Sequence, residues 1–295
     1  MVASISFIYA AWNVYYELLS QSLYPVIEAL IQWTTKDEYD IDLSFTLTKF
    51  SLPYTCILLS IFLYIIISFG NIKVFIKLNS YGTVFTIFII SFIVYFGFAS
   101  FTNTTFVFGE STEKVLNQRN IDLFKLNFAP LAGMSTLGFW LHNVSLPILK
   151  NNKDKENNFR DLFFGYFMTF WFYIVVGSLG YLGFSGVLFK DSMGIEKAQN
   201  WLNLFPPKHI AAFAVRVALF SQILLVYPLL FHIMSIQISL CLTKQPEMPE
   251  IYKRIMYFVL IGINTVLGAW YPEVGSIIGL LGSILGLNLM YIIPI

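Results

Sequence analysis

The stretch S51-LPYTCILLSIFLYIIIS-F69 contains no charged residue, and it is long enough to cross the hydrocarbon core of a bilayer as one helix. Seven further segments are comparably apolar and of similar or greater length. They are 3–32, 79–101, 129–149, 162–186, 209–242, 254–271 and 275–295. Because a helix satisfies all its backbone hydrogen bonds inside lipid, we predict an all-α, polytopic membrane protein. Residues 1–295 are expected to form a single transmembrane domain of about eight helices.

The composition excludes the soluble class. Apolar residues make up 57% of the chain and charged residues 12%, against roughly 45–50% and 25% in soluble domains. The net charge of +1 gives no indication of a nucleic-acid partner. Cys56 and Cys241 lie far apart in the sequence and in no metal-binding spacing, so we expect neither a disulfide nor a metal site. Met1 leads directly into the first apolar segment, which is therefore expected to be retained as a span.

The basic residues predict the orientation. The short loops 70–78, 150–161 and 243–253 hold eight lysines and arginines, and the opposite loops hold eight over about twice the length. The higher density of basic residues places the short loops in the cytosol. With eight spans, both termini then lie in the cytosol as well. Asn103-Thr104-Thr105 is a glycosylation sequence in a loop on the opposite, lumenal side, so Asn103 is the predicted glycosylation site.

The fourth segment, 129–149, combines polar and helix-breaking residues that are unfavourable in a helix facing lipid. A broken helix here would free backbone groups for a zwitterionic solute, so we predict a substrate site in this segment. The alternative is a helix facing the bundle, whose small residues allow close packing. The candidate substrate-binding residues are Gly133, Ser135, Thr136, Gly138, His142 and Asn143.

Two other segments carry candidates for coupling an ion. Asn13 and Glu17 are four residues apart and therefore share a face of the first helix. In the sixth segment, Pro228 removes a backbone hydrogen bond and frees a carbonyl near the preceding turn. This carbonyl either binds an ion, with Ser221 and Tyr227 as candidate ion-coupling residues, or is met by Ser221 or a neighbouring helix. The alternative for Glu17 is a structural role, in which its side chain is a neutral, hydrogen-bonded acid or the residue lies near the cytosolic membrane interface. Arg216, in the sixth segment, is expected to extend its charged end to the membrane surface.

The glycines of two segments predict close helix packing. Gly275, Gly279, Gly282 and Gly286 lie along one face of the last segment, and Gly177, Gly180 and Gly183 form a similar run in the fifth. No phosphate-binding loop, zinc pair or nucleophile elbow occurs in the sequence, so we predict no catalytic residue and no enzyme. Transport or sensing is the favoured class, and the bilayer and a small solute are the expected partners.

The fourth and fifth segments resemble the amino acid/auxin permease family. The pattern is Gly133…Phe139-x-x-His142…Pro147-Ile148, then Arg160-Asp161, then Gly180-Tyr181-Leu182…Phe184. The loop Leu149–Leu162 is similar in particular to the lysosomal branch that transports and senses arginine. The resemblance implies the inverted-repeat fold of amino acid–polyamine–organocation transporters. The eight segments would then correspond to helices three to ten of eleven, with no counterpart to the first two and the last.

The resemblance implies a transporter of neutral or cationic amino acids, such as arginine, in the lysosomal or late endosomal membrane. It would work by alternating access, as a symporter. No cofactor is expected. Leu225 stands at the position where the family places a hydroxyl residue near its sodium site, so sodium coupling is not supported. Proton coupling or facilitated movement remain as alternatives. The second functional hypothesis is a sensor that binds an amino acid without transporting it and engages cytosolic nutrient-signalling partners.

Overall fold

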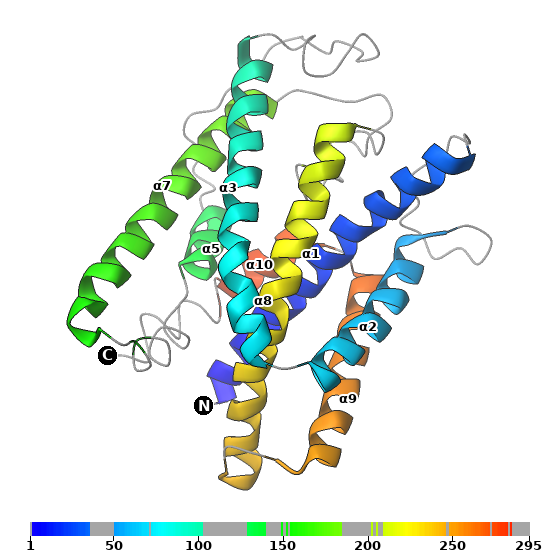
Figure 1. Cartoon of the computed structure of the whole chain (residues 1–295), viewed down its shortest axis with the longest axis vertical. Coiled ribbons are helices and arrows are strands. Elements are labelled where there is room, and N and C mark those ends of the chain that lie inside the picture. Colours follow the sequence, from blue (N-terminus) through cyan, green and yellow to red (C-terminus); the bar gives the residue numbers. More distant parts are fainter. Residues whose placement is uncertain are drawn as a thin grey trace. The chain divides into compact units, whose positions relative to one another are not determined.

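A computed structural model describes residues 2–35, 50–70, 72–102, 129–139, 154–184, 209–245, 248–271 and 273–282, with the single residues 149, 152, 202, 205 and 284. Every regular element in these ranges is a helix (Figure 1). The α-helices are α1 (Val2–Thr35), α2 (Leu52–Phe69), α3 (Ile72–Thr102), α5 (Ala129–Gly138), α7 (Asn158–Phe184), α8 (Ile210–Thr243), α9 (Glu250–Trp270) and α10 (Val274–Leu281). A short 3₁₀ helix, η1 (Lys155–Asn157), precedes α7.

Five helices in the described ranges are long and apolar enough to cross a membrane. The qualifying stretches are Leu52–Phe69, Val74–Ala99, Lys155–Tyr181, Ile210–Thr243 and Glu250–Trp270. Many large apolar side chains on these helices are exposed, as expected where the solvent is lipid. The chain is therefore a multi-pass, all-α membrane protein, which confirms the predicted fold class.

Two of the predicted spans extend past the described helices into residues that lie mostly outside the described ranges. The described helix of the fourth segment, α5, ends at Gly138, and α10 ends at Leu281. Helix α1 matches its predicted segment, but it is not among the five helices that qualify by composition. Its polar residues explain this, because Asn13, Gln21 and Gln32 add to Glu17 and Glu28 along the helix.

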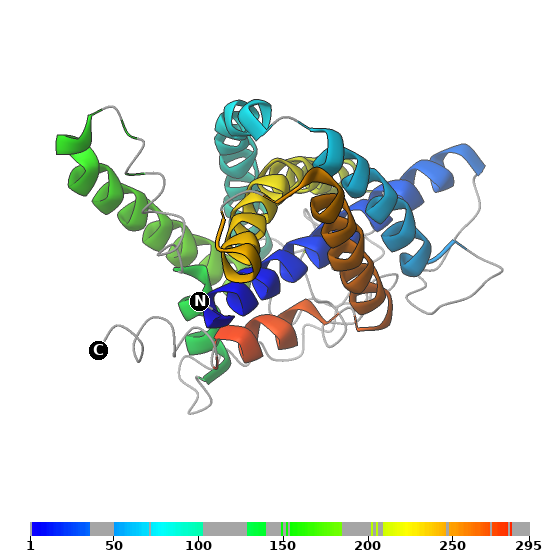
Figure 2. The same cartoon turned by 90° about the horizontal axis from the view of Figure 1, so that it is seen from below.

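The contacts divide the chain into two compact units, which we describe separately. The first comprises residues 1–89 and 191–277 and contains α1, α2, α8 and α9. Helix α1 contacts each of the other three, most extensively α8 (Figure 2). At the contact with α8, the buried Trp12 ring stacks on Tyr227 at 4.9 Å between ring centroids and meets Phe231 at 4.7 Å. Helix α1, which carries many of the buried polar residues, thus also supplies much of the core of the unit.

Helix α8 is continuous through Pro228 and is capped at its start by a side chain. The Nδ1 atom of His209 accepts a hydrogen bond from the backbone N–H of Ala212 at 3.1 Å. The prediction that Arg216 extends to the membrane surface is wrong, because its side chain is 1% exposed. Its guanidinium donates hydrogen bonds of 2.7 Å to the carbonyls of Leu202 and Phe205 and interacts electrostatically with Glu28. Arg216 therefore holds the backbone of Leu202 and Phe205 against α8.

The second unit comprises residues 90–190 and 278–295, and it contains α5, α7 and the later part of α3. Glycine allows close backbone approach at two places. A Cβ atom on Gly97 of α3 would lie 2.9 Å from the carbonyl oxygen of Leu179 on α7, and one on Gly282 would overlap the carbonyl of Gly133. The packing prediction for the last segment is thus confirmed at Gly282.

The same prediction is not confirmed at the described glycines of the fifth segment. A Cβ atom on Gly177 or Gly180 of α7 would meet no described atom within 4 Å. Gly279 of α10 is equally open. Spacing alone places glycines on one face, but it does not say whether another helix approaches that face.

Candidate functional site

Polar side chains gather inside the first unit, where α1, α2, α8 and α9 meet. We call this group the polar cluster. Its members are Asn13, Tyr16 and Glu17 of α1, Ser60 of α2, Tyr227 of α8, and Asn264 and Thr265 of α9. Apart from Ser60 and Thr265, which are half-buried, these side chains are buried. Polar groups at such depth are unfavourable unless they are paired or have a function.

One side of the polar cluster joins α1 to α9 and α8. The Asn13 side-chain amide donates a hydrogen bond to the Asn264 side-chain oxygen at 3.2 Å. The Tyr227 side chain lies near Asn264 and stacks on Trp12, which precedes Asn13. Three helices distant in sequence therefore meet through amide and aromatic groups.

The other side of the polar cluster joins α1 to α2 and α9 through hydroxyl groups. The Tyr16 hydroxyl donates to the backbone carbonyl of Cys56 at 2.7 Å and lies 2.7 Å from the Ser60 hydroxyl. The Ser60 hydroxyl is in turn hydrogen-bonded to Thr265, whose own hydroxyl donates to Ile261. Each hydroxyl has a partner, so this side is a satisfied network that holds the helices together.

Glu17 directly follows Tyr16 on α1, and its carboxyl group is unsatisfied. The residue is 0% exposed, and in the part of the chain that the structure describes no hydrogen-bond donor meets either carboxyl oxygen. Cys56 of α2 is close enough to interact with it electrostatically. An ionised carboxylate in such surroundings is costly, so the group must bind a proton or a cation to remain buried.

The predicted ion-coupling residues are only partly brought together. Asn13, Glu17 and Tyr227 all belong to the polar cluster. Ser221 does not, because its hydroxyl donates to the carbonyl of Val217 one turn earlier on α8, at 2.8 Å. The hydroxyl group therefore satisfies the backbone of its own helix.

The predicted substrate residues lie in the second unit or outside the described residues. Gly133, Ser135, Thr136 and Gly138 belong to α5, where Ser135 is exposed and Gly133 is buried. His142, Asn143 and the glycosylation candidate Asn103 lie outside the described residues.

The described end of α5 shows one contact that bears on the substrate prediction. The Tyr173 hydroxyl of α7 donates to the carbonyl of Gly138, the last residue of α5, at 3.0 Å. A carbonyl that ends a helix within a membrane protein needs such a donor. The assignment of a substrate site to this segment stays a prediction.

Sequence reasoning missed Tyr16, Ser60, Asn264 and Thr265. A signal was available in α1, because Tyr16 lies three residues after Asn13 and so shares its face. Asn264 is an amide inside an apolar segment and is unusual for that reason alone. Its partner, 251 residues earlier, could not be inferred from spacing.

Comparison with known proteins gives a consistent result. No protein-family profile matches the chain. Proteins named neutral amino acid transporter 9 are similar. That of Xenopus tropicalis is 30% identical over 234 residues, which is 78% of this chain and 40% of the relative. That of Xenopus laevis is 32% identical over 177 residues, 58% of this chain and 30% of the relative.

A Caenorhabditis elegans protein named sodium-coupled neutral amino acid transporter 9 homolog is 28% identical over 264 residues, 88% of this chain and 40% of that protein. The chain thus matches about 30–40% of the length of these relatives. Over most of its length, the chain is homologous to proteins named neutral amino acid transporter 9, in agreement with its resemblance to the amino acid/auxin permease family.

Proposed function

We propose that this chain forms part of an amino-acid transporter of lysosomal or late endosomal membranes that works by alternating access. The names of its relatives support amino-acid transport, and the apolar helices support a location in a membrane. The substrates are neutral amino acids, or cationic ones such as arginine. The chemistry is movement of a solute and not catalysis.

The observation that carries the proposal is the carboxyl group of Glu17, buried without a donor among apolar helices. A structural role would be served equally well by an apolar side chain, and at a lower free-energy cost. A coupling role needs a group that gains and loses a cation as the protein changes conformation. A buried carboxyl group without a hydrogen-bond donor is suited to this role, and Asn13 lies one turn away from Glu17 on the same helix.

In this mechanism the predicted substrate residues of the fourth segment bind the amino acid. Rocking of one group of helices against another then exposes the site to each side of the membrane in turn. Glu17 binds the coupling cation in one state and releases it in the other. Because Leu225 replaces the hydroxyl expected at a sodium site, the proposed cation is a proton.

Uptake by proteoliposomes tests the proposal. The full chain would be reconstituted and offered radiolabelled leucine, glutamine and arginine under a proton gradient or a sodium gradient. We expect saturable uptake of at least one amino acid that the proton gradient stimulates. Glu17→Gln should abolish the stimulation, while Glu250→Gln, which removes a carboxylate that is 74% exposed, should leave it intact.

Two results would contradict the proposal. Saturable binding of an amino acid without uptake, from a preparation shown by circular dichroism to be helical, would favour the sensor. Equal stimulation in the wild type and in Glu17→Gln would remove Glu17 from the coupling step. Fluorescence microscopy of a tagged chain together with a lysosomal marker tests the location separately.

A further inference from the structure

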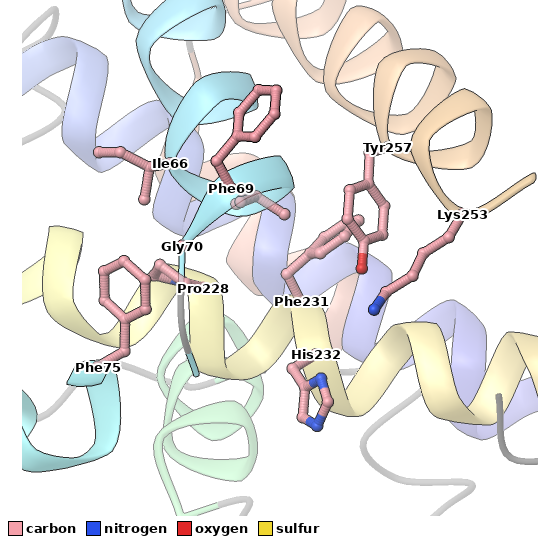
Figure 3. A pocket seen from close by; sticks show the side chains of 10 residues that line it. Ile66, Phe69, Gly70, Phe75, Pro228, Phe231, His232, Lys253 and Tyr257 are labelled. Atoms are coloured by element: carbon pink, nitrogen blue, oxygen red, sulfur yellow. The ribbon is translucent and has the colours of Figure 1, made fainter. Parts of the chain in front are cut away.

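A cavity of about 410 Å³ lies in the first unit between α2, α8, α9 and the start of α3. Most of its wall is apolar. The lining residues are Ile66, Ile67, Phe69, Gly70, Phe75, Pro228, Phe231, His232, Lys253 and Tyr257. Figure 3 shows Lys253 and Tyr257 extending from α9 toward α8, where Phe231 and His232 lie. The cavity is distinct from the polar cluster and shares none of its residues.

A second cavity, of about 260 Å³, shares two of these residues, His232 and Lys253. It is lined in addition by the hydroxyl groups of Ser235 and Ser239, by apolar and thioether side chains, and by the carboxylate of Glu250 at the start of α9. Lys253 and His232 thus stand where a mainly aromatic cavity and a more polar one meet. A ligand with an apolar part and a charged part fits this arrangement.

The charge at this place is positive and only weakly compensated. The Lys253 ammonium lies 4.0 Å from the Glu250 carboxylate, at the limit of an ion pair, and Glu250 is much the more exposed of the two. The same ammonium lies 5.9 Å from the centre of the Tyr257 ring. Lys253 is therefore largely available to an anionic ligand.

Further basic residues occur near the ends of the helices that form the cavity. Lys77 lies near the start of α3, Lys244 directly follows α8, and Arg254 lies near the start of α9. The Arg254 guanidinium lies 5.2 Å from the ring centre of Phe69, which is itself 71% exposed although it lines the cavity. The cavity therefore reaches the outer surface of helices that are apolar enough to contact hydrocarbon.

We propose that this cavity binds an anionic phospholipid, with its phosphate headgroup at Lys253 and His232 and its glycerol and upper acyl chain along Phe69, Phe75 and Phe231. Basic pockets between transmembrane helices on the cytosolic side are suited to such headgroups. The loops beside the cavity, 70–78 and 243–253, are the ones that the basic residues predict to be cytosolic. The proposal does not depend on transport activity.

Lipid-dependent thermal stability of the full chain tests the proposal. The protein would be delipidated in a neutral detergent and titrated with phosphatidylinositol 4-phosphate or with phosphatidylcholine. We expect saturable stabilisation by the anionic lipid only. Lys253→Gln should weaken its apparent affinity by about fivefold, the effect of one lysine near an anionic headgroup. Ile66→Trp, which fills the cavity without changing any charge, should weaken it as well.

The matched control is Lys77→Gln, which removes the same charge from an exposed position that does not line the cavity. It should change the affinity by less than about twofold. Equal losses in Lys253→Gln and Lys77→Gln would overturn the site, since only general attraction would remain. Equal stabilisation by phosphatidylcholine would also overturn it. If inorganic phosphate or soluble inositol 1,4-bisphosphate stabilises as well at the same concentration, the ligand is a soluble anion and the lipid assignment is wrong.

Discussion

Gly268 allows α9 to pack against Tyr16 of the polar cluster, and replacing it by alanine tests how tightly this contact is set. A Cβ atom at Gly268 would lie 3.0 Å from Cε1 and 3.4 Å from Cδ1 of Tyr16, and 3.7 Å from the Cys56 sulfur. The Tyr16 ring cannot easily move away, because its hydroxyl is hydrogen-bonded to the Cys56 carbonyl and to Ser60. We therefore expect the added methyl group to strain the contact.

The magnitude follows from two opposing terms. Alanine is favoured over glycine inside a helix by about 1 kcal/mol. Overpacking of a tight core costs about 1–3 kcal/mol. Gly262→Ala, on the same helix, would place its Cβ atom where no described atom lies within 4 Å, so only the first term applies. The free energy of unfolding of Gly268→Ala should thus be about 1–3 kcal/mol below that of Gly262→Ala.

Thermal unfolding of both variants in the same detergent measures this difference, at on the order of 2–4 °C per kcal/mol. A double-mutant cycle with Tyr16→Phe adds a second test. Without its hydroxyl anchor the ring can shift, so Gly268→Ala should be less destabilising in that background. Equal stability of Gly268→Ala and Gly262→Ala would refute the packing of α9 against Tyr16.

Three further predictions concern the first unit. Arg216→Leu should lower the free energy of unfolding by about 3 kcal/mol, because it leaves Glu28 and two carbonyls without the guanidinium. Arg216→Lys, measured in the same denaturation experiment, should recover part of the loss. Equal free energies of unfolding for the two variants would contradict this role of Arg216. His209→Ala should cost about 1 kcal/mol and His209→Asn much less, since asparagine also caps a helix; equal losses in thermal unfolding would rule out the cap. In the folded protein a maleimide should label Cys241, which is exposed, and not the buried Cys56, so mass spectrometry of Cys241→Ser should find no adduct before denaturation.

The apolar helices could be predicted closely from the sequence. The segment predicted at 51–69 is a helix over Leu52–Phe69, and the one predicted at 209–242 is a helix over Ile210–Thr243. An uncharged run of such length has few alternatives in lipid. The burial of Arg216 could not be predicted in the same way, because long basic side chains usually reach the surface. Only the fold shows that the carbonyls of Leu202 and Phe205 are within reach of its guanidinium.

The candidate site could be predicted in part. Asn13, Glu17 and Tyr227 were identifiable because each is polar and lies in a segment that is otherwise apolar. Their partners on α2 and α9 depend on which helices pack against α1, and helical spacing within one segment does not contain that information. Ser221 shows the opposite case, since a hydroxyl in a helix can satisfy the carbonyl of the preceding turn and need no ligand.

The hydrogen bond between Asn13 and Asn264 has a consequence for the order of events during synthesis. The two residues are 251 positions apart, so at ~5–20 residues per second the ribosome needs roughly 13–50 s to add the second after the first. During that interval α1 has emerged with its amide and carboxyl groups, while the helices that bury them, α8 and α9, do not yet exist. Helix α1 is therefore made before α8 and α9 but cannot reach its final packing until both have been synthesised. Until then its polar face must be kept from lipid by water or by the insertion machinery.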